Sequence, residues 1–352
     1  MRIAALFKKE AFMLYSIPKT RMLSSAQNSL SPDSKSKSMF SELLVFLLVA
    51  FICSFAMGMI ESIALSVVMM LDPSYHTLYG EMMQSGAVDT EALMSYMDTF
   101  LLNLPSEIYI VFLASSGLYI LASLIYCVKL EKRRAFSMGF IKKGILPEYF
   151  LGLGVGAVMI AIPALICFIT GCVKFSFNSS SSPLTLVLFF LAFVLQGMGE
   201  EVLFRGYLMT SLCRRHNEWV AIIVSALMFA VFHVPNASFS IIAFVNILLF
   251  GIFAGVFMLK RGSIWAVGAI HTAWNYLQGN IFGISVSGNP KFTSLFNASN
   301  SDFGAILSGG DFGLEGGLGA TVLLLVALLL ALMMPPKKSE LDPDYISYGA
   351  KE

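Results

Sequence analysis

Apolar segments about as long as a bilayer is thick recur along the whole chain and constrain its fold more than any other feature. A transmembrane helix needs about 20 mostly apolar residues to cross the hydrocarbon core. Only 13% of the 352 residues are charged, whereas soluble domains carry about a quarter. The sequence therefore predicts an all-α, polytopic membrane helical bundle of about eight transmembrane helices. The predicted spans are 42–70, 108–128, 150–173, 184–213, 218–235, 240–259, 263–282 and 315–334.

The distribution of Lys and Arg gives the expected orientation of the bundle, because cytoplasmic loops of membrane proteins carry an excess of these residues. With a cytoplasmic N-terminus, only Lys174 and Lys291 would lie in outer loops, and Arg205 would lie within a span. All other Lys and Arg would lie inside. We therefore expect both termini in the cytoplasm, and an integral, multi-pass protein of the plasma membrane if the source is bacterial.

The chain divides into four regions. The first begins with a basic amphipathic stretch, MRIAALFKKEAFMLY, which is expected on the membrane surface. A polar linker, SSAQNSLSPDSKSKS, follows and is expected to be flexible. The regions are the basic N-terminal segment with its linker (1–40), the first two membrane helices with an acidic outer loop (41–149), the segment with the intramembrane charges (150–282), and a Gly/Ser-rich outer loop with the last membrane helix and a cytoplasmic tail (283–352).

The segment GMGEEVLFRGYL places Glu200, Glu201 and Arg205 in the middle of a predicted span. Ionisable side chains at this depth are costly and normally face the bundle interior or a wet cavity, so each is a candidate for a functional site. Glu201 and Arg205 have the spacing at which an acid and a base share a helix face. Glu200 points about 100° away and is expected to have no partner in its own helix, which favours it as a reactive carboxylate. Alternatively, these charges only lock helices together through ion pairs.

Two histidines, His233 and His271, also fall inside predicted spans, and Asn275 shares a helix face with His271. At a rise of about 1.5 Å per residue, Glu200 and His233 lie about 21 and 22 Å from the cytoplasmic ends of their helices. The same rise gives about 12 and 18 Å for His271 and Asn275. These side chains could therefore line one cavity, although a single intramembrane histidine is more often only a satisfied polar contact.

Three motifs, in this order and spacing, resemble the CAAX-protease and bacteriocin-processing (Abi) family of intramembrane peptidases, which includes the Ras-converting CAAX endopeptidase. The family pattern has two adjacent glutamates followed by an arginine, a phenylalanine ahead of a histidine, and a histidine four residues before an asparagine. The resemblance covers roughly 150–282, which we therefore expect to be a CAAX-protease-like peptidase core. The matching positions are Glu200, Glu201, Arg205, Phe229, His233, His271 and Asn275.

The resemblance implies a catalytic role for four of these residues. Glu200 with His233 would activate a water for attack on a peptide carbonyl. His271 and Asn275 would donate hydrogen bonds to the resulting oxyanion. The remaining positions would have supporting roles, in which the Glu-Arg pair holds neighbouring helices together and tunes Glu200. The supporting positions are Glu201, Arg205 and Phe229.

The resemblance leaves the need for a metal open, because the family is often described as metalloproteases. A divalent metal such as zinc could be held by Glu200, His233 and His271 with one open position. The chain lacks the HExxH helix of zinc-dependent intramembrane proteases, and it has no GxSG or GxGD signature. We favour a glutamate and water mechanism that needs no cofactor.

The predicted function is that of an endopeptidase which cleaves a peptide or a lipid-anchored or membrane protein near the cytoplasmic leaflet. The expected partners are such a substrate and membrane lipids, and no nucleic acid. One alternative is a non-enzymatic membrane immunity or maturation factor that uses the same polar residues for binding. Another is a transporter whose intramembrane carboxylates carry protons, although repeated halves or broken helices are not evident in the sequence.

Overall fold

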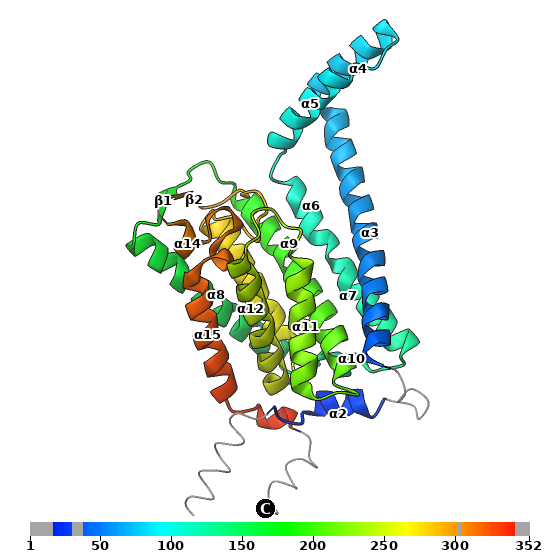
Figure 1. Ribbon diagram of the computed structural model, residues 1–352, viewed down its shortest axis with the longest axis vertical. Coiled ribbons are helices and arrows are strands. Elements are labelled where there is room, and N and C mark those ends of the chain that lie inside the picture. The colour runs from blue at the N-terminus through cyan, green and yellow to red at the C-terminus, as the bar shows by residue number, and fades with distance from the viewer. Residues whose placement is uncertain (1–16, 30–37, 302–303, 342–352) are drawn as a thin grey trace, which may run out of the picture.

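The fold is a bundle of long helices, which confirms the predicted class (Figure 1). The computed structural model describes residues 17–29, 38–301 and 304–341. Each predicted span corresponds to one helix or to a run of consecutive helical segments. These are α3 (Met39–Leu71), α6 (Ile108–Ser115) with α7 (Gly117–Leu124) and η2 (Ile125–Leu130), α8 (Ile145–Ile169), α9 (Pro183–Glu201) with η4 (Val202–Met209) and α10 (Thr210–Leu212), α11 (Glu218–Phe232), α12 (Ile241–Arg261), α13 (Ile264–Tyr276) with η5 (Leu277–Ile281), and α15 (Leu318–Met333).

Length and apolar composition distinguish these helices from one another. Within the described residues, 5 segments are long and apolar enough to cross a membrane: α3, the α6 to η2 run, α8, the α9 to α10 run and α12. The helices α11 and α15 are apolar but shorter. Because α11 ends at Phe232, it leaves space at one end of the bundle that loops and the candidate site occupy.

The outer regions predicted as loops contain regular structure. The acidic 72–107 segment folds into α4 (Pro73–Ser85) and α5 (Thr90–Leu102), which project beyond the bundle at the end of α3 (Figure 1). Two strands, β1 (Val173–Phe177) and β2 (Phe296–Asn300), pair antiparallel. The described chain is therefore mainly but not purely helical. The remaining short segments between β2 and α15 are α14 (Ala305–Ser308), η6 (Gly310–Phe312) and η7 (Leu314–Gly316).

The linker prediction is wrong at its N-terminal end, because Ser24 lies within a short helix, α2 (Arg21–Gln27). The Thr20 hydroxyl caps this helix by accepting a hydrogen bond from the Leu23 amide. The helix buries Met22, Leu23, Ser24 and Ala26 and packs against η3 (Ala135–Met138). The basic stretch predicted at residues 1–15 lies outside the described residues.

Helix α13 lies at the centre of the bundle, between α8 and α9. Two glycines on one face of α8 allow this close approach. A Cβ atom at Gly152 would lie 2.2 Å from the Ala266 carbonyl oxygen, and one at Gly156 would lie 2.4 Å from the Ile270 carbonyl oxygen. Small residues four apart let membrane helices pack with their backbones in contact. This packing fixes the height and rotation of α13, which carries His271 and Asn275.

Replacing Gly152 with alanine is expected to lower the free energy of unfolding by about 1–3 kcal/mol, as overpacking of a tight core does. The added methyl group can be accommodated only if α13 moves away from α8. The matched control is Gly154→Ala, because a Cβ atom at Gly154 meets nothing within 4 Å. Thermal unfolding of both variants in detergent measures the difference, and equal midpoints would show that the helix contact tolerates the methyl group.

Candidate active site

The predicted site residues come from three helices that meet around a cavity of about 220 Å³, here called the main cavity. Glu200 lies at the end of α9, His233 caps α11, and Asn275 lies in α13. A second, smaller cavity of about 30 Å³ adjoins these helices and is lined by His233, His271 and Asn275. The four predicted residues therefore do not line a single cavity: His233 and Asn275 line both, Glu200 lines only the main cavity, and His271 lines only the smaller one. The main cavity is lined by Leu113, Tyr119, Phe193, Gln196, Glu200, Phe204, Phe232, His233, Asn236, Asn275, Val286, Ser287, Asn289 and Phe292.

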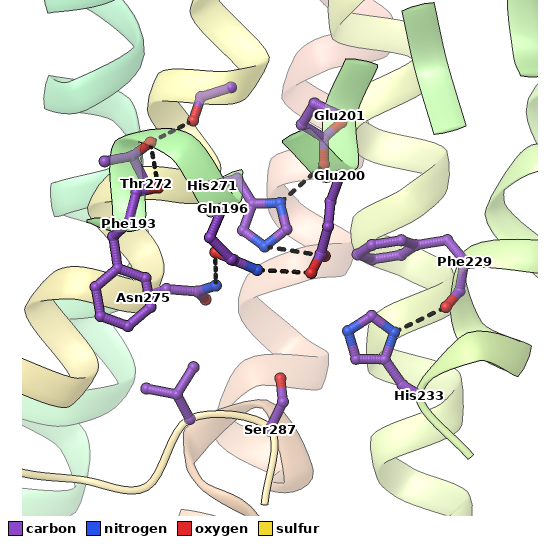
Figure 2. Close-up of polar contacts among 12 residues, drawn as sticks. Phe193, Gln196, Glu200, Glu201, Phe229, His233, His271, Thr272, Asn275 and Ser287 are labelled. Carbon is purple, nitrogen blue, oxygen red and sulfur yellow. Dashed lines mark hydrogen bonds and ion pairs between the residues drawn. The ribbon is translucent and has the colours of Figure 1, made fainter. Parts of the chain in front are cut away.

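Glu200 has a partner in its own helix, so the prediction that it has none is wrong. The Gln196 side-chain amide donates a hydrogen bond of 2.7 Å to Glu200 Oε1. Gln196 Oε1 in turn accepts a hydrogen bond of 3.0 Å from the Asn275 amide. The Glu200 Oε2 atom lies 3.8 Å from His271 Nε2 and has no hydrogen-bond partner among the described residues (Figure 2). One carboxylate oxygen is thus held in place, and the other remains able to accept a hydrogen bond.

Glu201 joins the neighbouring helices, as the sequence predicted for the Glu-Arg pair. Its Oε1 atom accepts hydrogen bonds from Arg205 Nη1 at 3.1 Å and from His271 Nδ1 at 3.0 Å. The side chains of Glu201 and Arg205 are both 0% exposed. The bond to Glu201 fixes the orientation of the His271 ring so that Nε2 faces Glu200. At this junction the backbone changes from α9 into the wider π-helical turns of η4, a local change that is frequent at functional sites.

Phe229 connects the Arg205 side chain to His233. The Arg205 guanidinium lies over the Phe229 ring, 4.3 Å from its centroid. The Phe229 carbonyl oxygen accepts a hydrogen bond of 2.8 Å from His233 Nδ1, which leaves Nε2 of that ring for other contacts. In Figure 2 the His233 ring lies on the opposite side of Glu200 from Gln196. His233 therefore shares the main cavity with Glu200, while the imidazole that approaches the Glu200 carboxylate is that of His271.

Ser287 lies in the loop that closes one side of the main cavity, and three contacts hold it. Its backbone amide and hydroxyl donate to Glu315 Oε1 at 2.6 and 2.7 Å, and its carbonyl accepts from the Asn236 amide at 2.9 Å. Glu315 is buried and also accepts a hydrogen bond from Gln278. Burial raises the pKa of Glu315, and the hydrogen bonds from Gln278 and Ser287 oppose that rise. Glu315 thus ties the loop to η5 and to the turn before α15.

Replacing Glu315 with alanine is expected to loosen this loop, because Ser287 loses the acceptor of two hydrogen bonds. Each lost hydrogen bond typically costs about 0.5–1.5 kcal/mol, and buried donors left unpaired cost more. Proteolysis of the protein in detergent should then cleave near Ser287 faster than in wild type. Glu340→Ala removes an acid at the opposite end of the bundle and is the control. Equal proteolysis of both variants would contradict the assigned role of Glu315.

The described residues do not provide a set of ligands for a metal ion. No three His, Cys, Asp or Glu side chains within residues 17–29, 38–301 and 304–341 converge as metal ligands do. His271 Nδ1 is engaged by Glu201, His233 Nδ1 by the Phe229 carbonyl, and Glu200 Oε1 by Gln196. A catalytic zinc site needs three protein ligands at about 2.0–2.2 Å. Glu200, His233 and His271, as placed, do not meet this requirement.

Three residues that position the site were missed by the sequence analysis: Gln196, Ser287 and Glu315. Gln196 carries a local signal, since a polar residue four positions before Glu200 shares its helix face. Ser287 and Glu315 carry no such signal. Their contact joins two loops far apart in the chain, and Gly313, with a φ of 108°, allows the close approach of its backbone to the Ser285 carbonyl.

Comparison with known proteins gives a match to one family over the region that contains the candidate residues. Residues 182–277 match the family model described as type II CAAX prenyl endopeptidase Rce1-like. A search of curated proteins and a search of solved structures found no match. The matched region begins at the cap of α9, ends just after α13, and contains Glu200, His233, His271 and Asn275. Within this integral membrane protein, residues 182–277 are therefore similar to the CAAX-protease family.

Proposed function

We propose that this protein is an intramembrane endopeptidase that hydrolyses a peptide bond with a water activated by Glu200. The observation that carries the proposal is the Glu200 carboxylate itself. Gln196 holds its Oε1, while its Oε2 lacks a hydrogen-bond partner among the described residues. The Glu200 side chain is 18% exposed and lines the main cavity. A carboxylate that lines a polar cavity and has one oxygen without a partner is suited to bind and deprotonate a water.

The proposed reaction begins with a water that donates a hydrogen bond to Glu200 Oε2 and a second one to His233 Nε2. The water oxygen attacks the peptide carbonyl carbon, and its proton passes to Glu200. The second N–H group of Asn275, which is not used in the bond to Gln196, donates to the oxyanion, which raises the rate by electrostatic stabilisation. The carbon–nitrogen bond then breaks, and the proton returns from Glu200 to the leaving amine.

His271 has a positioning role in this scheme and assists the oxyanion when protonated. Its Nδ1–H donates to Glu201 Oε1, which leaves Nε2 directed at Glu200 and the substrate space. Arg205 forms an ion pair with Glu201. The charge of Glu201 is therefore compensated next to the carboxylate of Glu200. The proposed reaction uses no metal ion.

The family match extends the proposal to the class of substrate. The matched family is described as type II CAAX prenyl endopeptidases, so a peptide, or a protein anchored in the membrane by a lipid or a helix, is the proposed substrate. An embedded site reaches chains that are held at the membrane, where a soluble peptidase would lack access. The family match and the carboxylate geometry both favour peptidase chemistry over the immunity and transporter alternatives.

The test compares cells that express the wild-type protein, Glu200→Ala or His233→Ala at equal membrane levels. New peptide termini are identified by mass spectrometry, and termini found only with the wild type are the expected result. Glu91→Gln, which alters an exposed acid on α5, should retain all of them. Identical termini in all strains would refute the peptidase proposal and favour a binding role.

Chelators provide a separate test of the reaction mechanism. Cleavage by the purified protein at the sites found in cells is expected to be unchanged after prolonged treatment with EDTA or 1,10-phenanthroline. The contrary outcome is that chelation abolishes activity and added zinc restores it. That result, together with evidence that Glu200, His233 and His271 bind the zinc, would contradict the metal-independent mechanism. Such a result would leave the peptidase proposal itself intact.

A further inference from the structure

The two ends of the bundle differ in charge. A salt bridge of 2.7 Å between Arg214 and Glu131 joins two of the loops at one end, here called the basic end. Apart from Arg205, Lys174 and Lys291, every Lys and Arg that the structure describes lies at the basic end. These residues are Lys19, Arg21, Lys129, Lys132, Arg133, Arg134, Lys142, Lys143, Arg214, Arg215, Lys260, Arg261, Lys337 and Lys338.

The other end, here called the outer end, carries the acidic α4 and α5 and the β1–β2 pair (Figure 1). By the positive-inside rule the basic end faces the cytoplasm. The main cavity extends from mid-depth toward the outer end. At about 1.5 Å per residue, Glu200 lies about 21 Å from Arg214 at the basic end and about 26 Å from Pro183 at the outer end. Asn275 is about 18 Å along its helix from Ser263 at the basic end, but only about 9 Å from Ile281, and His233 caps the outer end of α11.

The rim of the main cavity consists of outer-end loops. Asn236 follows α11, and Asn289 follows η5 and is exposed to solvent. The Asn236 amide joins the two loops by its bond to the Ser287 carbonyl. A hydrogen bond between Ser106 and Thr293 also links the second of these loops to the segment between α5 and α6. The groups that a substrate would meet first therefore belong to the outer end.

The floor of the main cavity closes it toward the basic end. Phe204 and Phe232 form part of its wall, with ring centroids 5.4 Å apart. Beyond them every residue of η4 is buried. The buried Arg133 side chain fills the space below, where it donates hydrogen bonds to Ser211 and Thr210. A chain approaching from the basic end would have to displace this layer.

We infer that the peptidase receives its substrate from the non-cytoplasmic side of the membrane. This inference rests on the proposed function, and it differs from the expectation that cleavage occurs near the cytoplasmic leaflet. The substrate class is a secreted or membrane-anchored polypeptide whose cleaved segment emerges on the outer face. A protein whose cleavage site stays in the cytoplasm would have no path to Glu200.

The lining of the main cavity further restricts the cleaved segment. Four side-chain amides, which can bond to an extended peptide backbone, are interspersed with aromatic and aliphatic side chains. Among the described residues, no Lys or Arg lines the cavity, and Glu200 is the only acid that does. A volume of about 220 Å³ is below the roughly 300–1,000 Å³ of pockets that enclose drug-sized ligands. The cavity therefore accepts a short, uncharged stretch of chain. The four amides are Gln196, Asn236, Asn275 and Asn289.

Cysteine labelling of the full chain in spheroplasts tests the orientation without reference to activity. The five native cysteines are buried, so single new cysteines report their own location. Ser179→Cys and Asn289→Cys, in outer-end loops, are expected to react with a membrane-impermeant maleimide as completely before permeabilisation as after it. Lys338→Cys, at the basic end, should react only after permeabilisation. The reverse pattern would overturn the inference.

Oriented membrane vesicles test the access of substrate. The probe is a library of internally quenched, uncharged hexapeptides that a sulphonated fluorophore keeps from crossing the membrane. Right-side-out vesicles are expected to hydrolyse the probe, whereas inverted vesicles should do so only after detergent is added. Hydrolysis by intact inverted vesicles alone would overturn the inference and leave the proposed function standing. If the probe is not hydrolysed even in detergent, while Asn289→Cys is labelled from outside, the result counts against the proposed function and not against the orientation.

Discussion

The variant Glu200→Gln is expected to hydrolyse peptides roughly 10²–10⁴-fold more slowly than the wild type, the range that a positioned general base contributes. The amide can still accept the hydrogen bond from Gln196 that Glu200 Oε1 accepts at 2.7 Å. It cannot take a proton from water. Shape and helix contacts are therefore preserved while the base is lost. The rate is measured with a peptide that contains one of the cleavage sites found in wild-type cells.

The control for this variant separates chemistry from folding. The unfolding midpoint of Glu200→Gln in detergent should stay close to that of the wild type, because Glu200 forms no salt bridge with Lys or Arg among the described residues. Glu91→Gln makes the same chemical change on the exposed surface of α5 and should retain the full rate. A Glu200→Gln enzyme with at least half of the wild-type rate would assign the base to another group.

The second large effect is expected for Arg205→Met, which should lower the free energy of unfolding by about 3–5 kcal/mol, as removal of one partner of a buried ion pair does. Both Glu201 and Arg205 are 0% exposed. Without Arg205 the Glu201 carboxylate stays buried with His271 as its partner, and the contact of the guanidinium with Phe229 is lost. Chemical unfolding in detergent micelles measures the change.

Two variants make this prediction specific. Arg261→Met removes one of the two cations that pair with Glu148 at the basic end, where Arg261 is 22% exposed and Lys337 still bonds Glu148 at 2.9 Å. Its effect should be smaller, about 1.5–3 kcal/mol as for a hydrogen bond to a charged group, because Glu148 keeps Lys337 as a partner. The double variant Glu201→Gln with Arg205→Met should recover part of the lost stability, because no buried charge remains unpaired. Equal effects of Arg205→Met and Arg261→Met would refute the role of burial.

The sequence predicted the helices with good accuracy because the bilayer imposes one strong requirement on them. Apolar runs of sufficient length mark the spans, and every predicted span has a helical counterpart in the structure. The polar α4 and α5 and the β1–β2 pair were not predicted. Water can satisfy the backbone groups of such loops, so composition constrains them far less than it constrains a segment in lipid.

The polar residues of the site could also be selected from the sequence, since charges inside an apolar helix are rare and costly. The residues that these side chains contact could not be selected from the sequence. The contacts of Glu200 with Gln196 and His271 depend on rotamers and on how closely α13 approaches α9. The position of Ser287 depends on Glu315, which reaches it from a loop 28 residues further along the chain.

The sequence by itself therefore determined the membrane bundle, the family motifs and the residues Glu200, Glu201, Arg205, His233, His271 and Asn275 as candidates, because each follows from local composition or spacing. Only the tertiary structure decided which imidazole faces Glu200, which loop closes the cavity and at which end it opens. These features depend on packing between segments that are distant in the chain. Side-chain directions and loop contacts of that kind are set by the neighbours that the fold supplies, and no local pattern encodes them.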